Sequence, residues 1–504
     1  MTVFILVAGA FTGPYVWRDT AARLAAEGAE VHTVALTGLG EGPADPGAAV
    51  DLETHVADVL AVIDSVDVGR GRDIVLVGHD YGVHPALGAA DRRARSVARI
   101  VHLDSGMPQD GVPALAAVPD QRLREELSGG GRRQTGALPP PARDGWPRWG
   151  STAGLSEAAL DGLTALAAPQ PLGTLLQPLR LTGAGAAIPV TGVLCTGNGP
   201  GIEMVQLRVD VGDQAFQALA DPRVTFFELP TGHWPMLSCP VELAEVLIDA
   251  AAGRGHRLTP ADGAHPPAHL RPFLLDVPER PRERTGNTDL YLPEGPGPHP
   301  AVVFVHGGPV PAGTRPTPRD WPALRGYAGH VAGHGAVGVT LDHRLHAVTD
   351  YERAAEDVAA AVARVRADPR VDADRIALWF FSGGGPLTAD WLAAPPAWLC
   401  CLAVNYPILA PLPNWGVVGG RFHPVRAVAH AGELPIVLVR AGREMAEIAA
   451  TVEEFLTEAA RRGAAVEVVD VPEGRHGFET HDSTDEARAA VRRAVGAVLA
   501  HLRA

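Results

Sequence analysis

A serine followed by three glycines closes a strongly apolar stretch in the second half of the sequence. The stretch reads IALWFFSGGG and places Ser382 where a buried strand would turn toward a helix. A nucleophile elbow has the pattern G-x-S-x-G, and here Gly384 is present whereas Phe380 replaces the first glycine. A serine hydroxyl becomes a nucleophile when a nearby base takes its proton. The pattern therefore predicts a serine hydrolase if a base and an acid follow.

Both partners follow Ser382 along the chain. His476 stands in a loop after the apolar stretch VEVVDV, where it can act as a general base. Between the two, the stretch PIVLVRAGRE ends on Glu444, whose carboxylate can orient the imidazole, and Glu447 is the alternative one helical turn further on. The order serine, acid, histidine is the one expected after such an elbow. We therefore predict a catalytic triad of Ser382, Glu444 and His476.

A pair of glycines in AVVFVHGGP supplies the remaining part of such a site. Backbone N–H groups stabilise the negative charge that develops on a carbonyl oxygen in the transition state. We expect the N–H groups of Gly308 and Gly383 to form this oxyanion hole. We expect His306 to brace the loop rather than to react.

The first half repeats the pattern with an aspartate at the elbow. The stretch DIVLVGHDYG keeps both elbow glycines and places Asp80 at the nucleophile position, and His233 follows the later stretch VTFFELP. A carboxylate that attacks an ester would give an anhydride. A carboxylate that attacks an sp³ carbon gives an alkyl ester, which water activated by histidine then hydrolyses. Asp80 therefore predicts opening of an epoxide or of a carbon–halogen bond.

The third member of this second site is an acid. Asp104 ends the stretch ARIVHLD, at an alternative acid position, and is our prediction. After PVTGVLCTG, where an acid often sits, the chain reads Asn198-Gly199-Pro200, and Glu203 lies a few residues further on. The N–H groups of Ala10 and Tyr81 are the expected oxyanion hole. The two halves thus predict an Asp-His-Asp site and a Ser-His-Glu site in one chain.

Short apolar strands alternate with amphipathic helical stretches in both halves, which predicts mostly parallel sheets flanked by helices, with catalytic groups at strand ends. Residues 107–187 lose this rhythm and are expected to form a cap. Residues 254–270 are rich in Pro, Gly and His and are expected to be a linker. The predicted domains are therefore residues 1–253 and residues 271–504.

Composition narrows the function. The 504 residues carry a net charge of −15, which argues against a nucleic-acid partner. All 43 basic residues are Arg, so Schiff-base chemistry and Walker A loops are excluded. We expect no metal, no cofactor, no membrane span and a small-molecule substrate. Four cysteines without metal-ligand spacing indicate a reducing, cytoplasmic location, and the bias to Ala, Gly, Pro and Arg suggests a bacterial source. The oligomeric state stays open.

The motifs FVHGGP, LDHRL, FFSGGG and GRHGF make residues 271–504 resemble the dienelactone-hydrolase and esterase branch of the α/β-hydrolases. The first half, through FILVAGAF, LTGLGEG, GHDYG and TGHWPM, resembles plant-esterase and hydroxynitrile-lyase-type α/β-hydrolases, although its Asp elbow is similar to that of haloalkane dehalogenases and epoxide hydrolases. The resemblance implies two tandem α/β-hydrolase domains. It also implies the site roles given above.

Three features of the first half depart from these families. Ala8 replaces the usual histidine of the oxyanion loop, residues 107–187 contain no tyrosine to protonate an epoxide, and Tyr81 replaces the halide-binding tryptophan. An indole donor would then come from one of three other tryptophans, namely Trp146, Trp149 and Trp234. Two rival hypotheses therefore stay open: only the second half is catalytic while the first binds or scaffolds, or both halves are interaction modules.

Overall fold

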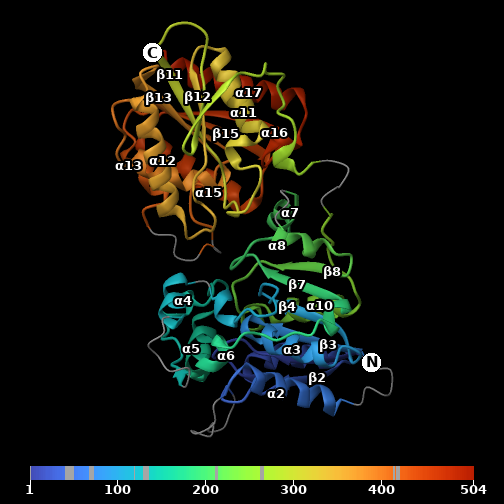
Figure 1. Cartoon of the computed structure of the whole chain (residues 1–504). Helices are drawn as coiled ribbons and strands as arrows, with labels where there is room; N and C mark the ends of the chain where they lie inside the picture. The colour runs from blue at the N-terminus through green and yellow to red at the C-terminus, as the bar shows by residue number, and fades with distance from the viewer. Residues whose placement is uncertain are drawn as a thin grey trace. The chain divides into compact units, whose positions relative to one another are not determined.

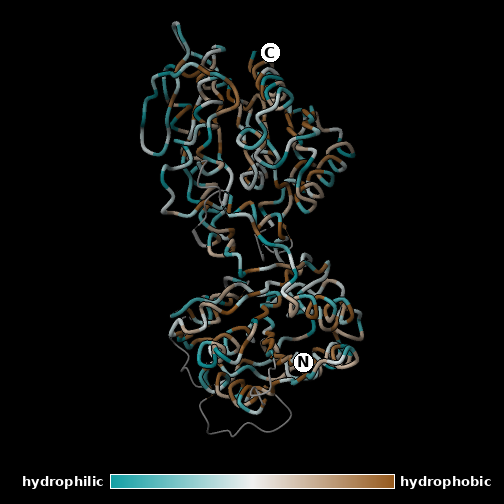
Figure 2. The backbone as a smooth tube through the Cα atoms, turned by 90° about the vertical axis from the view of Figure 1, so that its right-hand side faces the viewer, coloured by the Kyte–Doolittle hydropathy of each residue, from teal (hydrophilic) through white to brown (hydrophobic). Residues whose placement is uncertain are grey.

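The computed structural model describes residues 2–39, 50–66, 73–118, 120–128, 136–210, 214–260, 266–412, 415 and 420–503. The chain forms two compact units, one extending to Pro260 and the other built from the second half. Each unit holds its own mostly parallel sheet with helices around it (Figure 1). Hydrophobic stretches run through the middle of each unit (Figure 2). The predicted α/β fold class is confirmed.

The sheet of the first unit is parallel throughout and has the strand order β2-β1-β3-β4-β7-β8. Its central strand β3 lies between β1 and β4, so the end of β3 is flanked by two further strand ends. The apolar side chains of these strands are almost fully buried, which stabilises each large one by about 1.5–3 kcal/mol. The strands are β1 (Thr2–Val7), β2 (Glu30–Val34), β3 (Asp73–His79), β4 (Val97–Leu103), β7 (Val190–Cys195) and β8 (Val224–Leu229).

Helices of the first unit pack in pairs, α1 against α10 and α2 against α3. Helix α2 begins with a capping box, in which Asp51 accepts from the Thr54 N–H and the Thr54 hydroxyl accepts from the Asp51 N–H. The helices are α1 (Arg18–Ala26), α2 (Leu52–Ser65), α3 (Val83–Arg92), α7 (Ile202–Asp210), α8 (Gln214–Gln217), α9 (Pro235–Ser238) and α10 (Pro240–Ala251).

The segment predicted as a cap is inserted between β4 and β7 and adds no strand to the main sheet. Its described residues form short elements of their own. These are α4 (Gln121–Ser128), β5 (Ala137–Leu138), α5 (Glu157–Leu166), β6 (Gln170–Pro171) and α6 (Leu172–Leu176), with β5 and β6 paired antiparallel.

The second unit has an eight-stranded sheet of order β16-β15-β14-β13-β11-β12-β10-β9. Only β10 and β9 run antiparallel to their neighbours. The strands are β9 (Arg282–Thr285), β10 (Thr288–Tyr291), β11 (His299–Val305), β12 (Val337–Leu341), β13 (Val371–Phe381), β14 (Leu399–Asn405), β15 (Ile436–Arg443) and β16 (Val466–Arg475). The helices are α11 (Pro322–Gly333), α12 (Tyr351–Ala367), α13 (Thr388–Ala393), α14 (Pro424–Ala427), α15 (Ala446–Arg462), α16 (Phe478–His481) and α17 (Asp485–His501).

The segment predicted as a linker is partly packed. His256 exchanges backbone hydrogen bonds with Phe226 of β8, and Leu258 is buried beside it. At the other end, Ala268 is buried in a single 3₁₀ turn of the second unit. Residues 261–265 of this segment, and residues 40–42 of the LTGLGEG motif, lie outside the described residues.

Among the described residues, no helix is both long and apolar enough to cross a membrane. The same residues contain no cluster of three or more His, Cys, Asp or Glu arranged to hold a metal ion.

Candidate active sites

Strand β13 delivers Ser382 at its end, and the chain there adopts a strained turn. Ser382 has a φ of +49°, a left-handed conformation that costs free energy in a non-glycine residue. The following residues form a 3₁₀ turn, Ser382–Leu387, rather than the α-helix expected directly after the serine. A Cβ on Gly383 would meet the Gly308 oxygen at 1.9 Å, so this position requires glycine. Phe380, the departure from the elbow pattern, is fully buried in the strand between its neighbours.

A continuous hydrogen-bonded relay begins at this serine. Ser382 Oγ lies 2.7 Å from His476 Nε2, and His476 Nδ1 lies 2.8 Å from Glu444 Oε2. The other oxygen of Glu444 accepts the Met445 N–H at 2.8 Å, which fixes the carboxylate. The His476 and Glu444 side chains are only 10% and 4% exposed, so water screens their interaction weakly. The structure thus brings the three residues of the predicted Ser-His-Glu site together, with Glu444 rather than Glu447 on the imidazole.

The glycine loop after β11 lies directly against the elbow. A Cβ on Gly307 would meet Ser382 Cβ at 2.9 Å, so the loop approaches the serine as closely as backbone allows. His306 and His343 stack face to face behind it with their ring centroids 3.6 Å apart. His306 Nδ1 donates to the Gly307 oxygen at 2.6 Å, and His343 Nε2 donates to the His306 oxygen at 3.0 Å. These contacts give His306 the bracing geometry that the sequence predicts.

Burial keeps this histidine pair neutral. It lowers the pKa of His343 to about 4 and the pKa of His306 well below its usual range, and the neighbouring rings of His343 and His346 lower the pKa of His306 further. Each ring therefore has one donor and one acceptor nitrogen, as its hydrogen bonds require.

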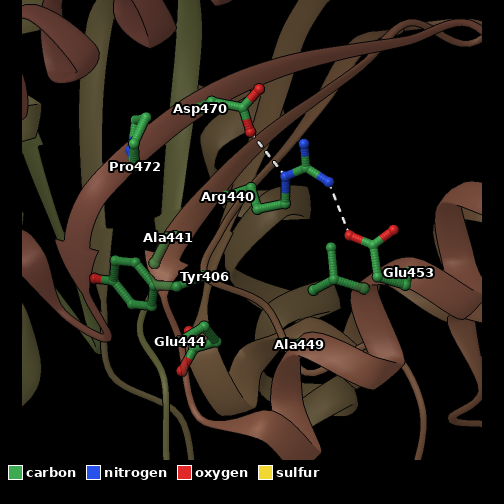
Figure 3. Close-up of a pocket in the computed structure, with 10 residues that line it drawn as sticks. Tyr406, Arg440, Ala441, Glu444, Ala449, Glu453, Asp470 and Pro472 are labelled. Carbon is green, nitrogen blue, oxygen red and sulfur yellow. Dashed lines mark hydrogen bonds and ion pairs between the residues drawn. The ribbon is translucent and has the colours of Figure 1, made fainter.

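A pocket of about 440 Å³ lies beside the acid of this relay, bordered by Tyr406 and Glu444 (Figure 3). Arg440 also borders it and pairs with Asp470 at 2.7 Å and Glu453 at 2.8 Å. The Tyr406 ring contacts the His476 ring edge to face, with centroids 4.8 Å apart. Tyr406 thus borders the pocket and also contacts the imidazole.

The elbow of the first unit has the same backbone form. Asp80 follows β3 with a φ of +48°, and a Cβ on Gly82 would meet the Ala8 oxygen at 2.5 Å. Asp80 Oδ2 accepts the Ala10 N–H at 3.2 Å, so the carboxylate itself occupies one donor of the expected oxyanion hole. The Tyr81 hydroxyl is buried and hydrogen-bonds to His55 Nδ1 at 2.8 Å. The Tyr81 side chain is therefore engaged with helix α2.

His233 lies between two carboxylates. Its Nδ1 is 2.6 Å from Asp104 Oδ2, and its Nε2 is 3.8 Å from Asp80 Oδ1. Asp104 has a φ of +46° directly after β4, and its other oxygen accepts the Cys195 N–H at 3.1 Å. Glu203, the other acid considered from the sequence, is exposed on helix α7. The three predicted residues of the Asp-His-Asp site are thus adjacent.

Asn198 was not predicted from the sequence, yet it belongs to this cluster. Its Nδ2 donates to Asp104 Oδ2 at 2.7 Å and lies 3.1 Å from His233 Nδ1. Its oxygen accepts the N–H of Ser151, a cap residue, at 2.6 Å. It follows β7 just as Glu444 follows β15, so the two units place an amide and a carboxylate at corresponding strand ends. The sequence already shows that Asn198 stands where an acid often follows this strand, but its contact with His233 appears only in the structure.

The cap segment lies on the histidine loop. The His233 N–H donates to the Ser151 oxygen at 2.7 Å, and the Gly232 N–H donates to the Ala153 oxygen at 2.9 Å. The indole N–H of Trp146 donates to Thr164 within the cap at 3.0 Å, which removes it as a donor to a ligand at Asp80.

The two carboxylates control the protonation of His233. Burial alone would lower the pKa of His233, but hydrogen bonds and charges from Asp104 and Asp80 outweigh it and raise the pKa to about 10. Burial likewise opposes ionisation of Asp80, but its contacts with His233 hold the pKa of that carboxyl well below its usual range. The resting site is therefore an imidazolium between two carboxylates.

This arrangement predicts a pH dependence. Because the pKa of His233 is raised on folding, the stabilisation it contributes is complete below the unfolded value of about 6.5 and is lost as the pH rises through about 10. In an NMR titration the His233 ring should stay protonated at pH 8, and Asp80→Asn should lower its pKa. Asp64→Asn, which removes an exposed carboxylate, should leave it unchanged. A wild-type His233 that titrates below pH 7 would contradict the arrangement.

The first half of the chain is similar to known hydrolases. A family model described as the alpha/beta hydrolase family matches residues 4–246. The carbendazim hydrolyzing esterase of Nocardioides sp. (strain SG-4G) is 32% identical over 250 residues, which are 49% of this chain and 98% of that protein. The chain therefore belongs to the alpha/beta hydrolase family. The matched residues lie in the first unit, and membership of this family supports a hydrolase.

Part of the chain is also similar to solved structures of lower identity. An extracellular alpha/beta-hydrolase from a Paenibacillus species is 22% identical, with a TM-score of 0.40 over 50% of this chain and 99% of that chain. A bacterial heroin esterase is 20% identical, with a TM-score of 0.38 over 43% of this chain and 80% of that chain.

Proposed function

We propose that the protein is a tandem hydrolase whose second domain, residues 271–504, is a serine esterase of the dienelactone-hydrolase type. The observation that carries this proposal is the relay from Ser382 Oγ through His476 to Glu444, with distances of 2.7 and 2.8 Å. Its strained serine stands beside a glycine loop, which is the arrangement that nucleophilic attack and oxyanion binding need.

The proposed reaction at this site has two steps, acylation and deacylation of Ser382. Ser382 Oγ attacks the ester carbonyl carbon while its proton passes to His476 Nε2, and the N–H groups of Gly308 and Gly383 hold the oxyanion. The carbon–oxygen bond to the alcohol breaks, the alcohol leaves with the proton from His476, and an acyl ester stays on Ser382. Water then gives a proton to His476 and attacks the acyl carbon. The bond to Ser382 Oγ breaks, the acid leaves, and His476 returns the proton to Ser382 Oγ. Glu444 stabilises the imidazolium in both steps.

Intact-mass analysis after treatment with a fluorophosphonate tests this assignment. We expect one phosphonyl adduct per chain together with the loss of p-nitrophenyl acetate hydrolysis. A chain that hydrolyses this ester but takes up no adduct would rule out a serine nucleophile.

For the first domain, residues 1–253, the same proposal assigns Asp80 as a nucleophile toward an sp³ carbon of an epoxide or a haloalkane. The supporting observation is that Asp80 Oδ2 already accepts the Ala10 N–H. This donor is then in place when water attacks Asp80 Cγ and negative charge develops on Oδ2. A substrate carbonyl would have to compete with the carboxylate for the same donor, so ester cleavage by the usual route is disfavoured here.

His233 fits the second step of that reaction. Alkylation of Asp80 removes one of the two charges that hold the His233 proton, so its pKa falls and the ring can act as a base. The base would thus become available only after the covalent intermediate has formed. The rival role, a binding domain without catalysis, is supported by the raised pKa of His233, because a protonated ring has no lone pair with which to accept a proton.

A further inference from the structure

A buried carboxyl group lies three residues beyond His476 and outside the relay. Glu479 stands in the short helix α16, and only 1% of its surface is exposed. Withdrawing a carboxyl group from water is costly unless hydrogen bonds compensate. Burial accordingly raises the pKa of Glu479. A buried acid so close to the proposed base calls for a physical explanation.

Its hydrogen bonds point into the core of the unit. Glu479 Oε1 accepts from the Tyr327 hydroxyl at 2.7 Å and from Asn405 Nδ2 at 2.7 Å. Asn405 is fully buried, its oxygen accepts the Trp379 indole N–H at 2.9 Å, and its Nδ2 also donates to the Tyr327 oxygen at 3.0 Å. Four side chains, one each from α11, β13, β14 and α16, therefore share one hydrogen-bond network.

This network includes residues close to Ser382 and residues close to His476. Trp379 lies on β13, three residues before Ser382. Asn405 ends β14 and precedes Tyr406, whose ring contacts His476 and whose backbone is strained at a φ of +36°. Figure 3 shows Tyr406 beside the pocket that Glu444 also borders. The network thus joins strand β13, which leads to Ser382, to the Tyr406 ring and to the segment that carries His476.

The first unit holds its histidine by other means. Three residues beyond His233 stands Met236, and β4 ends on Leu103, so no polar network exists at these two positions. Instead, backbone groups of Ser151 and Ala153 in the cap hold the loop. In the second unit, the buried hydrogen bonds of Glu479 hold the segment that carries His476. In the first unit, the cap holds the corresponding segment that carries His233.

We propose that Glu479 is a positioning residue of the ester-cleaving site, which fixes the His476 loop and the Tyr406 ring by accepting hydrogen bonds from Tyr327 and Asn405. This inference rests on the proposed role of His476 as the base. The essential group is the Oε1 acceptor, which glutamine retains and leucine lacks at similar volume.

Paired substitutions test the inference. Glu479→Gln should keep kcat for p-nitrophenyl acetate within about 3-fold of wild type, because its carbonyl oxygen accepts the same two hydrogen bonds. Glu479→Leu should lower kcat about 10- to 100-fold with little change in KM, because a displaced base slows proton transfer without removing substrate contacts. Fluorophosphonate labelling of Ser382 should slow by the same factor. Rates are taken per folded molecule, as measured by circular dichroism.

A second readout does not depend on activity. The low-field proton resonance of His476 Nδ1 in its hydrogen bond to Glu444 should be present in wild type and Glu479→Gln and lost in Glu479→Leu. If wild type fails to label at Ser382, the proposed esterase function falls while this resonance still decides the positioning role. Should the leucine variant not fold, Tyr327→Phe, which removes one donor, should lower kcat about 3- to 10-fold. A fully active Glu479→Leu or Tyr327→Phe, or a glutamine variant as impaired as leucine, would overturn the inference.

Discussion

Replacing Ser382 by alanine is expected to lower kcat for p-nitrophenyl acetate by at least about 10⁴-fold. The alanine variant keeps the fold, since a hydroxyl is lost and nothing is added, but no atom is left to form the acyl intermediate. The measurement is steady-state hydrolysis at neutral pH, with circular dichroism to show that the variant is folded. The residual rate should be that of the oxyanion hole and of binding alone.

Ser483→Ala is the matched control, because Ser483 is exposed in the same unit. It should hydrolyse the ester at the wild-type rate. A folded Ser382→Ala protein that retains wild-type turnover would show that the hydrolysis takes place elsewhere in the chain.

The second large effect is expected at the Asp80 site. If Asp80 attacks a carbon and displaces a halide or opens an epoxide, His233→Gln should block hydrolysis of the resulting ester more than its formation. The reason is that attack by a carboxylate needs no base, whereas attack by water does. The alkyl-Asp80 ester should then accumulate to about one equivalent, visible by intact mass after incubation with a panel of haloalkanes and epoxides.

Oxygen-18 distinguishes this route from its rivals. During turnover in labelled water the wild-type Asp80 carboxylate should acquire the label, because water attacks its own Cγ. A binding domain predicts no adduct and no label with any substrate. Robust turnover with an unlabelled Asp80 and an active Asp80→Asn variant would contradict the nucleophile assignment.

Much of the fold follows from local patterns in the sequence. The buried strands β1, β3 and β13 are continuous apolar runs, and helix α12 buries apolar residues that are spaced three and four apart in the sequence. Strand β9 cannot be predicted from an apolar pattern, because all four of its residues are polar or charged and exposed at the sheet edge. The 3₁₀ turn after Ser382 also differs from the expected helix, since Gly385 lies close to the Ile408 backbone and Pro386 lacks an N–H.

Some residues of the candidate sites can likewise be predicted from the sequence, whereas others cannot. Residues at strand ends, such as Asp80 and Ser382, are recognised by their neighbours in sequence. Asn198, His343 and Glu479 are not, because their significance depends on which side chain lies opposite them in space. Asn198 follows its strand within an ordinary turn sequence, and Glu479 reads as a solvated helix carboxylate until the fold buries it. Long-range hydrogen bonds of this kind leave no local signal.

The location of the fluorophosphonate adduct decides whether Ser382 is the nucleophile. Cleavage after arginine releases the peptide spanning residues 376–421, in which Ser382 is the only serine. We expect fragmentation of this peptide from the treated wild-type protein to place the whole adduct on Ser382, and the Ser382→Ala protein to take up none. An adduct on any other residue, in a protein that loses its esterase activity in proportion, would contradict it.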